Sequence, residues 1–199
     1  MPTVCPYRPE FEAALRLLAR ISAGMDSAGY RPPVLVGGAA VEIYTRGAVN
    51  TGDFDLACGR QDVLEGLMQR HGFVRPSGPG NATRGWVHPE LRLGFEVVSD
   101  TLLDGMADRE MVQVVELAPD GAIAVIAPED IIADRMGQYA SGSAPEMLGQ
   151  ARALFALCEG LDIAYMDRRI REETGGSYAV QDLEDQTGDS DAGSAGRGG

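Results

Sequence analysis

Between residues 34 and 58 the chain runs through an apolar segment, a glycine pair, a helical segment and an acidic segment, and this order constrains the fold more than any other feature. Val34–Val36 is a short apolar run that stops at Gly37 and Gly38, and helical composition returns over Ala39–Tyr44. Glycine permits a tight turn and a close approach of the backbone to other groups. We therefore predict a strand, a glycine turn and a helix, followed by a second strand.

The second strand is predicted over Thr51–Cys58 and carries two carboxylates. Phe54 and Leu56 alternate with Asp53 and Asp55 in this segment. A two-residue alternation is typical of a strand with one buried face and one polar face. Both aspartates are therefore expected to project from the same side of the strand, with solvated acids at a strand end as the alternative.

A third carboxylate, that of Glu96, lies between Phe95 and Val97 in another apolar segment. This segment, Leu91–Ser99, is predicted to form a hairpin with Gly85–His88. An ionised acid in the interior of a strand needs a charged partner or a metal ion. The alternative is an acid on the exposed face of an edge strand, which the same alternation also predicts.

These residue types together favour chemistry on phosphates. Backbone N–H groups at a glycine turn, and the positive end of the helix that follows, can hold a triphosphate. Carboxylates on adjacent strands can bind Mg²⁺, which prefers oxygen ligands and usually arrives with phosphates. Two such ions can stabilise the attacking and leaving oxygens of an in-line displacement. For the glycine pair, a turn needed only for packing remains the alternative.

The composition excludes several classes of protein. The chain has 199 residues and a formal net charge of −13, and its 17 basic residues are all arginines. Without lysine it can form neither a Schiff base nor a Walker phosphate loop, and its charge argues against a broad nucleic-acid-binding face. The three cysteines form no CxxC pair, which predicts reduced thiols. We find no signal peptide or membrane-spanning pattern, and expect a cytoplasmic protein without a membrane partner.

The remaining segments predict a sheet followed by helices. An amphipathic helix is expected near the N-terminus and a short one after the acidic strand, and two further strands precede a run of three helices. These segments are Pro9–Ala28, Gln61–Arg70, Met111–Leu117, Ala122–Ile126, a helix from Pro128, Pro145–Glu159 and Leu161–Glu173. Beyond Gly175, the composition of Gly, Ser, Asp and Gln is typical of a disordered tail.

Two of these segments resemble a known family. The stretch from Val34 through Arg46 to Leu56 resembles the signature of the nucleotidyltransferase superfamily that includes DNA polymerase beta. It is most similar to the small bacterial branch typified by abortive-infection nucleotidyltransferase toxins. Ala127–Met136 resembles the helix that follows the catalytic sheet in that branch. The resemblance covers about Val34–Leu157 and implies an α+β fold, a nucleotidyltransferase-like mixed β-sheet flanked by helices with a C-terminal helical segment.

On this resemblance the chain divides into three parts. Residues 1–126 are expected to form the catalytic core, and residues 127–174 a C-terminal helical segment of the same domain. Residues 175–199 are expected to be a disordered acidic tail.

The resemblance also implies a role for individual residues. The catalytic and metal-binding residues are expected to be Asp53, Asp55 and Glu96. The nucleotide-binding residues are expected to be Gly37, Gly38, Arg46 and Arg135. The cofactor implied is Mg²⁺, as two ions, and the substrate is a nucleoside triphosphate. Many members have a serine after the first glycine and a lysine where Arg135 stands, and this chain has neither.

The expected activity is Mg²⁺-dependent transfer of a nucleoside monophosphate from a nucleoside triphosphate to a hydroxyl group. The acceptor is left open among a protein, a tRNA end and a small molecule. The resemblance also implies a possible role in a toxin–antitoxin pair, with an antitoxin as partner. The alternative is a catalytically degenerate protein of the same fold that binds nucleotide or acts as an interaction module. A metal-dependent phosphohydrolase is disfavoured, because two histidines cannot build a second metal cluster.

Overall fold

The computed structural model describes residues 7–50, 52–76 and 85–184. Its helices and strands follow one another along the chain as α1 (Pro9–Ser27), β1 (Val34–Val36), α2 (Gly37–Tyr44), β2 (Asp53–Ala57), α3 (Gln61–Arg70), β3 (Trp86–His88), β4 (Leu93–Ser99), β5 (Gln113–Glu116), β6 (Ala122–Val125), α4 (Pro128–Ala140), α5 (Met147–Leu157) and α6 (Ile163–Glu173). Short 3₁₀ turns occur at Leu103–Gly105 (η1), Arg109–Met111 (η2) and Val180–Leu183 (η3).

The six strands of the described residues form one mixed sheet in the order β3-β4-β2-β1-β6-β5. β1 runs antiparallel to β2 and parallel to β6, whereas β2 and β4 are parallel. β3 and β4 form the expected hairpin, and β5 and β6 form a second one. The prediction of an α+β fold with a mixed sheet flanked by helices is therefore confirmed.

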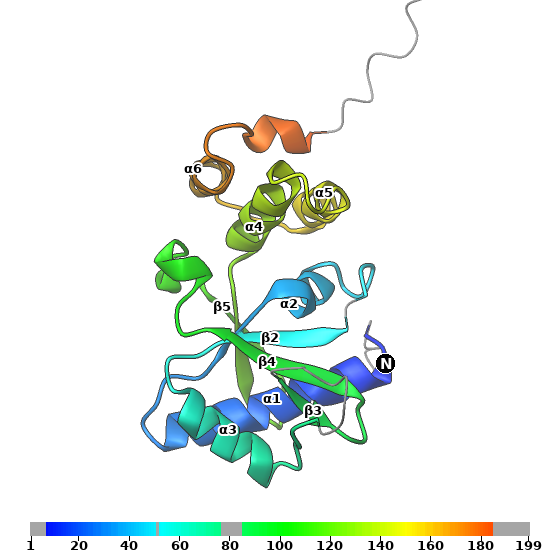
Figure 1. Ribbon diagram of the computed structural model, residues 1–199, viewed down its shortest axis with the longest axis vertical. Coiled ribbons are helices and arrows are strands. Elements are labelled where there is room, and N and C mark those ends of the chain that lie inside the picture. Colours follow the sequence, from blue (N-terminus) through cyan, green and yellow to red (C-terminus); the bar gives the residue numbers. More distant parts are fainter. Residues whose placement is uncertain (1–6, 51, 77–84, 185–199) are drawn as a thin grey trace, which may run out of the picture.

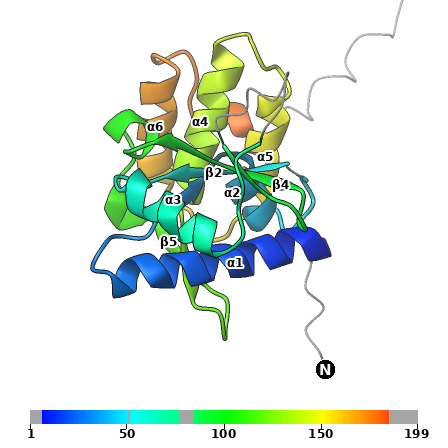
Figure 2. The same ribbon diagram turned by 60° about the horizontal axis from the view of Figure 1, so that its bottom comes forward.

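Helices cover the sheet on both sides (Figure 1). α1 and α3 lie against one face, and α2 separates the other face from the C-terminal helices α4, α5 and α6. Figure 2, turned by 60°, shows α1 running across the whole width of the sheet. α1 begins with Pro9 and two acids in its first turn, an arrangement that suits the free N–H groups at a helix start.

The face of the sheet toward α1 and α3 carries an aromatic core. Phe54 of β2 stacks on Phe95 of β4 with ring centroids 4.5 Å apart. Phe11 of α1 contacts Phe54 at 5.1 Å, and Phe73 meets Phe95 edge-on at 4.7 Å. Because side chains alternate along a strand, burying these phenylalanines turns the acids between them to the opposite face.

A buried ion pair joins two of the C-terminal helices. The Arg169 side chain of α6 is fully buried, and its Nε donates to Oδ1 of Asp130 of α4 at 2.8 Å. The Tyr165 hydroxyl lies 2.9 Å from the other carboxylate oxygen of Asp130. The remaining guanidinium nitrogens of Arg169 donate to Glu172 and Glu173. A buried charge of this kind is tolerated because each of the three guanidinium nitrogens has an acceptor.

The prediction that a disordered tail begins at residue 175 places its start too early. Residues 175–184 continue the folded part, because η3 packs against α5 and α6 and buries Val180 and Leu183. These two apolar side chains anchor an otherwise polar segment. The average composition of the segment does not reveal them. Residues 185–199 lie outside the described residues. Within the described part of the chain, no helix combines the length and the hydropathy needed to cross a membrane.

Candidate active site

The three predicted carboxylates come together on the face of the sheet that lies toward α2. Asp53 and Asp55 are two residues apart on β2, so they share a face. Asp55 pairs in register with Glu96 of β4, and residues paired in a parallel ladder point to the same side. β4 lies between β2 and β3, so Glu96 is on an interior strand and not on a sheet edge. The arrangement gathers three acids on two neighbouring strands.

The start of α2 lies directly beside Asp55. Val36, the last residue of β1, pairs in register with Asp55, and the chain then turns into the helix at Gly37. Gly37 has a φ of +60°, in the left-handed region that favours glycine. A Cβ atom at Gly37 would also collide with the Asp55 carboxylate. Both the turn and the space beside Asp55 therefore require glycine here.

A second glycine, which the sequence analysis did not select, stands beside Asp53. Gly94 of β4 pairs with Asp53, and a Cβ atom added to it would lie 2.6 Å from the Asp53 Oδ1. A side chain at this position would displace the carboxylate. The sequence did contain a signal for Gly94 as a site residue, because Gly94 lies two residues before Glu96 on the same strand face. It becomes readable only once β2 and β4 are known to pair.

The electrostatics of the site centre on Asp55. Burial raises the pKa of its carboxyl above the ordinary value near 3.8, and the neighbouring Asp53 and Glu96 raise it further. Arg135 and the N–H of Gly38, which donates to the carboxylate, act in the opposite direction on this pKa. The rise prevails, because burial and the two neighbouring acids together outweigh the groups that lower this pKa. Such a site favours binding of a cation between the carboxylates.

Arg135 reaches this site from α4. Its side chain is buried, and one terminal nitrogen donates to Asp134 at 2.8 Å. Its Nε has no hydrogen-bond acceptor within the described residues, although it is shielded from solvent. A buried guanidinium nitrogen without an acceptor is costly. An anionic group brought in by a ligand, such as a phosphate, would supply the missing acceptor.

A pocket of about 230 Å³ opens over the acids and is lined by Asp53, Asp55 and Glu96 together with Arg92 and Trp86. Arg92 was not selected by the sequence analysis. It is exposed and adopts a φ of +54°, in the turn between β3 and β4. A single arginine in a short turn gives no signal in a sequence. The pairing of β3 with β4 is what brings it to the acids.

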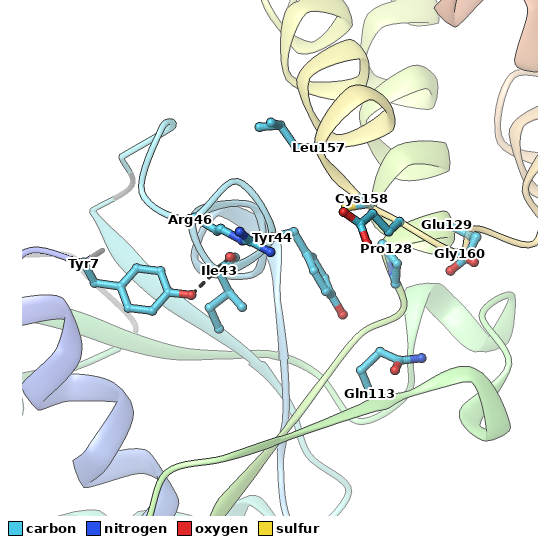
Figure 3. A pocket seen from close by; sticks show the side chains of 11 residues that line it. Tyr7, Ile43, Tyr44, Arg46, Gln113, Pro128, Glu129, Leu157, Cys158 and Gly160 are labelled. Atoms are coloured by element: carbon cyan, nitrogen blue, oxygen red, sulfur yellow. Dashed lines mark hydrogen bonds between the residues drawn. The ribbon is translucent and has the colours of Figure 1, made fainter. Parts of the chain in front are cut away.

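Arg46 lies apart from the other predicted site residues. It lies two residues beyond the end of α2, whereas Gly37 and Gly38 begin that helix, so the length of the helix, about 12 Å, separates them. Arg46 instead lines a different pocket of about 350 Å³ with Tyr44 and Leu157. Figure 3 shows this pocket, in which Arg46 projects beside Tyr44 and the Tyr7 hydroxyl donates to the carbonyl oxygen of Ile43 at 3.2 Å.

The fit of Mg²⁺ to this site rests on its oxygen donors. Within residues 7–50, 52–76 and 85–184, no three His, Cys, Asp or Glu side chains are gathered so that they could hold a metal ion by themselves. Mg²⁺, however, is commonly held by one or two carboxylates together with substrate phosphates and water. Asp53 and Asp55 supply the carboxylates, and the raised pKa of Asp55 reflects its burial together with the charges of Asp53 and Glu96. The donor set therefore fits Mg²⁺ that arrives with a phosphate ligand.

Replacing Gly37 with alanine tests the turn. We expect Gly37→Ala to lower the free energy of unfolding by about 1–3 kcal/mol, because a Cβ is strained at this φ and collides with Asp55. Gly142→Ala is the matched control, since Gly142 has a similar φ of +75° and nothing within 4 Å of the added Cβ. Urea denaturation of both variants separates strain from collision. An equal loss in the two variants would contradict the close approach of Gly37 to Asp55.

Comparison with known proteins places this fold among nucleotidyltransferase structures. No protein-family model matches the chain, and a search of curated protein sequences finds no match either. Among solved structures, the chain is similar to the antibiotic-resistance factor ANT(2'')-Ia, with a TM-score of 0.51 and 15% identity over 80% of this chain and 90% of that one. It is also similar to an antigenic nucleotidyltransferase-like protein from Paracoccidioides brasiliensis, with a TM-score of 0.51 and 19% identity over 74% of this chain and 75% of that one. The chain therefore has the nucleotidyltransferase fold, and the likeness does not single out the abortive-infection branch.

Proposed function

We propose that this protein transfers a nucleoside monophosphate from a nucleoside triphosphate to an acceptor hydroxyl. The observation that carries the proposal is the meeting of Asp53, Asp55 and Glu96 on one sheet face beside the start of α2. A nucleotidyltransferase needs these parts together, namely backbone N–H groups for the phosphates and acids for the metal ions. The nucleotidyltransferase fold supports the same conclusion.

In the proposed reaction, the acceptor oxygen forms a bond to the α-phosphorus while the bond from that phosphorus to the bridging oxygen of pyrophosphate breaks. Pyrophosphate leaves with the bonding electron pair, and the acceptor loses its proton. Glu96, half-buried beside Asp55, is the carboxylate we assign to helping remove that proton. Gly37 and Gly38 orient the triphosphate through backbone N–H groups at the start of α2, and Arg135 neutralises part of its charge.

Mg²⁺ is the cofactor we propose, held by Asp53 and Asp55, with Glu96 as the third carboxylate. When bound, Mg²⁺ stabilises the charge that develops on the attacking and leaving oxygens. This chain's acids hold it, its glycines leave room for the acids, and Arg135 supplies fixed positive charge from α4. Arg46 is left out of the nucleotide site, because it lies at the far end of α2.

For the acceptor, we favour a small molecule or a protein over an extended RNA, because the net charge of −13 opposes a long polyanion. One structural neighbour, ANT(2'')-Ia, is an antibiotic-resistance factor with a conformation regulated by substrate. A place in a toxin–antitoxin pair, with an antitoxin as protein partner, stays a proposal that rests on the resemblance of the sequence.

Two observations favour a second candidate, a protein of this fold that has lost catalysis and binds nucleotide or a partner. In the described part of the chain no three acids form a ready metal site, and lysine is absent throughout the sequence. Metal dependence separates the two candidates. A catalytic site binds nucleoside triphosphate more tightly when Mg²⁺ is present, whereas a degenerate site binds it equally with and without the metal.

The experiment that tests the proposal incubates the purified full chain with each common nucleoside triphosphate, labelled at the α-phosphate, together with Mg²⁺ and a cell lysate. We expect label in a protein, RNA or small-molecule fraction, and that fraction identifies the class of acceptor. The same reaction with chelator in place of Mg²⁺ is the control. Label that appears equally in both reactions, or in neither, would count against the transferase.

A further inference from the structure

Three arginines line one pocket at the end of the sheet opposite to the candidate active site. The pocket has a volume of about 330 Å³ and is lined by Arg31, Arg60 and Arg109. It lies where β1 begins and β2 ends, since Ala57 and Cys58 also line it. The predicted catalytic acids lie toward the other end of these antiparallel strands. The pocket is therefore separate from the site proposed for nucleotidyl transfer.

Arg60 forms a fixed wall of this pocket. Its guanidinium donates two hydrogen bonds to Asp62, at 2.9 and 2.8 Å, and lies over the ring of Tyr30 with its central carbon 4.4 Å from the ring centroid. These contacts hold the guanidinium plane in one orientation. They also occupy part of its charge, because Asp62 is its ion-pair partner. Most of the pocket's uncompensated positive charge must then come from the other two arginines.

Arg31 and Arg109 have no such partners. Neither side chain forms a hydrogen bond or ion pair within the described residues, although both belong to a chain with 30 acidic groups. Elsewhere in the same protein arginines find acids readily, as Arg16 and Arg20 do when they share Asp120. The carboxylate next to Arg109 in sequence, that of Asp108, accepts a hydrogen bond from the Glu110 N–H instead. Two guanidinium groups thus remain free to bind an anion from solvent.

The rest of the pocket adds no negative charge to oppose that anion. α3 begins immediately after Arg60, so the positive end of its dipole faces this region, although Asp62 in the first turn offsets part of it. Burial raises the pKa of the Cys58 thiol, which keeps this group neutral at physiological pH. The neighbouring connection, Gly29–Pro32, places backbone and not acids around the cavity.

We propose that Arg31 and Arg109, with Arg60 as the wall, form a binding site for the phosphate group of a small phosphorylated molecule. Arginine matches the geometry of a phosphate with paired N–H donors, and two of them can hold a dianion from two sides. The pocket is concave and close to the lower size limit of ligand sites, which suits a small molecule. The net charge of the chain disfavours a nucleic acid that extends beyond the pocket.

Calorimetric titration of the full chain with inorganic phosphate, in chelator and without nucleotide, tests this proposal. We expect saturable binding to one site. Arg31→Gln/Arg109→Gln should weaken binding by about tenfold or more, because charge-assisted hydrogen bonds to phosphate are lost. Both residues are exposed, so the variant is expected to fold, and thermal unfolding verifies this. Arg70→Gln is the control for a loss of positive charge, since it removes one such charge at the other end of α3, away from the pocket.

Three further measurements each have an outcome that would contradict the proposed phosphate site. Asp53→Asn/Asp55→Asn should bind phosphate as the wild type does, and a loss of binding there would assign the phosphate to the candidate active site and overturn the proposal. Equal weakening by Arg70→Gln would show a general charge effect instead of a site. Tighter binding of a single-stranded oligonucleotide without terminal phosphate, lost in the arginine variant, would replace the small molecule by a nucleic acid. Because nucleotide and metal are absent, these results are independent of the transfer reaction.

Discussion

Asp53→Asn/Asp55→Asn is expected to abolish transfer of the nucleotidyl group. Asparagine keeps the shape of the side chain and removes the negative charge that would hold Mg²⁺. Removal of groups that only support metal ligands commonly reduces activity or metal affinity 10–100-fold, so loss of the two ligands themselves should exceed about a hundredfold. The assay with α-phosphate label measures this loss, and binding of nucleoside triphosphate should become independent of Mg²⁺ in the same variant.

The chain provides a matched control for this variant. A second Asp-x-Asp sequence, Asp189–Asp191, lies outside the described residues, and Asp189→Asn/Asp191→Asn removes the same charge. Transfer should persist in the control. Activity that survives in Asp53→Asn/Asp55→Asn, or that falls equally in both variants, would contradict the assignment of β2 as the strand that binds the metal.

The charge of Asp55 is expected to lower the free energy of unfolding of the protein. The pKa of Asp55 is raised in the folded protein, so the folded state binds a proton there more readily than the unfolded state does. The stability contributed by this group therefore falls as the pH rises from the unfolded pKa near 3.8 through the folded pKa, and the full penalty is present above the folded pKa. We expect Asp55→Asn to be at least as stable as the wild type at pH 7, measured by urea denaturation. A large loss of stability would show that the carboxylate is a structural group.

Arg169→Met is expected to cause the largest loss of stability of any substitution considered in this protein. It removes the fully buried partner of Asp130 and leaves that carboxylate in the interior with only Tyr165 as a hydrogen-bond donor among the described residues. Breaking a buried pair from one side typically costs about 3–5 kcal/mol, because one charge stays buried without compensation. Denaturation at equilibrium measures this cost.

Two further variants distinguish this explanation from a general loss of packing. Arg168→Met changes the neighbouring arginine, whose side chain is 57% exposed and pairs with Glu172 at 3.2 Å, and should cost less than about 1 kcal/mol. Asp130→Asn/Arg169→Met removes both charges and should recover part of the stability, since neither charge of the pair is left buried. No recovery in this double variant would indicate that the shape of Arg169, and not its charge, holds the helices together.

Much of the fold was accessible from the sequence because it depends on local pattern. The alternation of Phe54 and Leu56 with acids predicted β2 and the shared face of Asp53 and Asp55. The apolar run before Gly37 predicted β1 and the turn into α2. Each of these features depends only on residues that lie close together in the sequence, so composition and spacing are sufficient to predict it. The predicted start of the tail was wrong, because an average composition does not reveal two single apolar residues, Val180 and Leu183, that anchor the segment.

The sequence by itself determined that two carboxylates share a strand face and that glycine turns the chain beside a helix start. Only the tertiary structure decided which other groups join them. Glu96 meets Asp55 because β2 and β4 pair in parallel, across an intervening helix and hairpin strand, and no local pattern encodes such a pairing. Arg135 reaches the acids because α4 packs over α2, whereas Arg46 is carried away by the length of α2 itself. Side-chain periodicity is local, but the meeting of elements depends on the packing of the whole core.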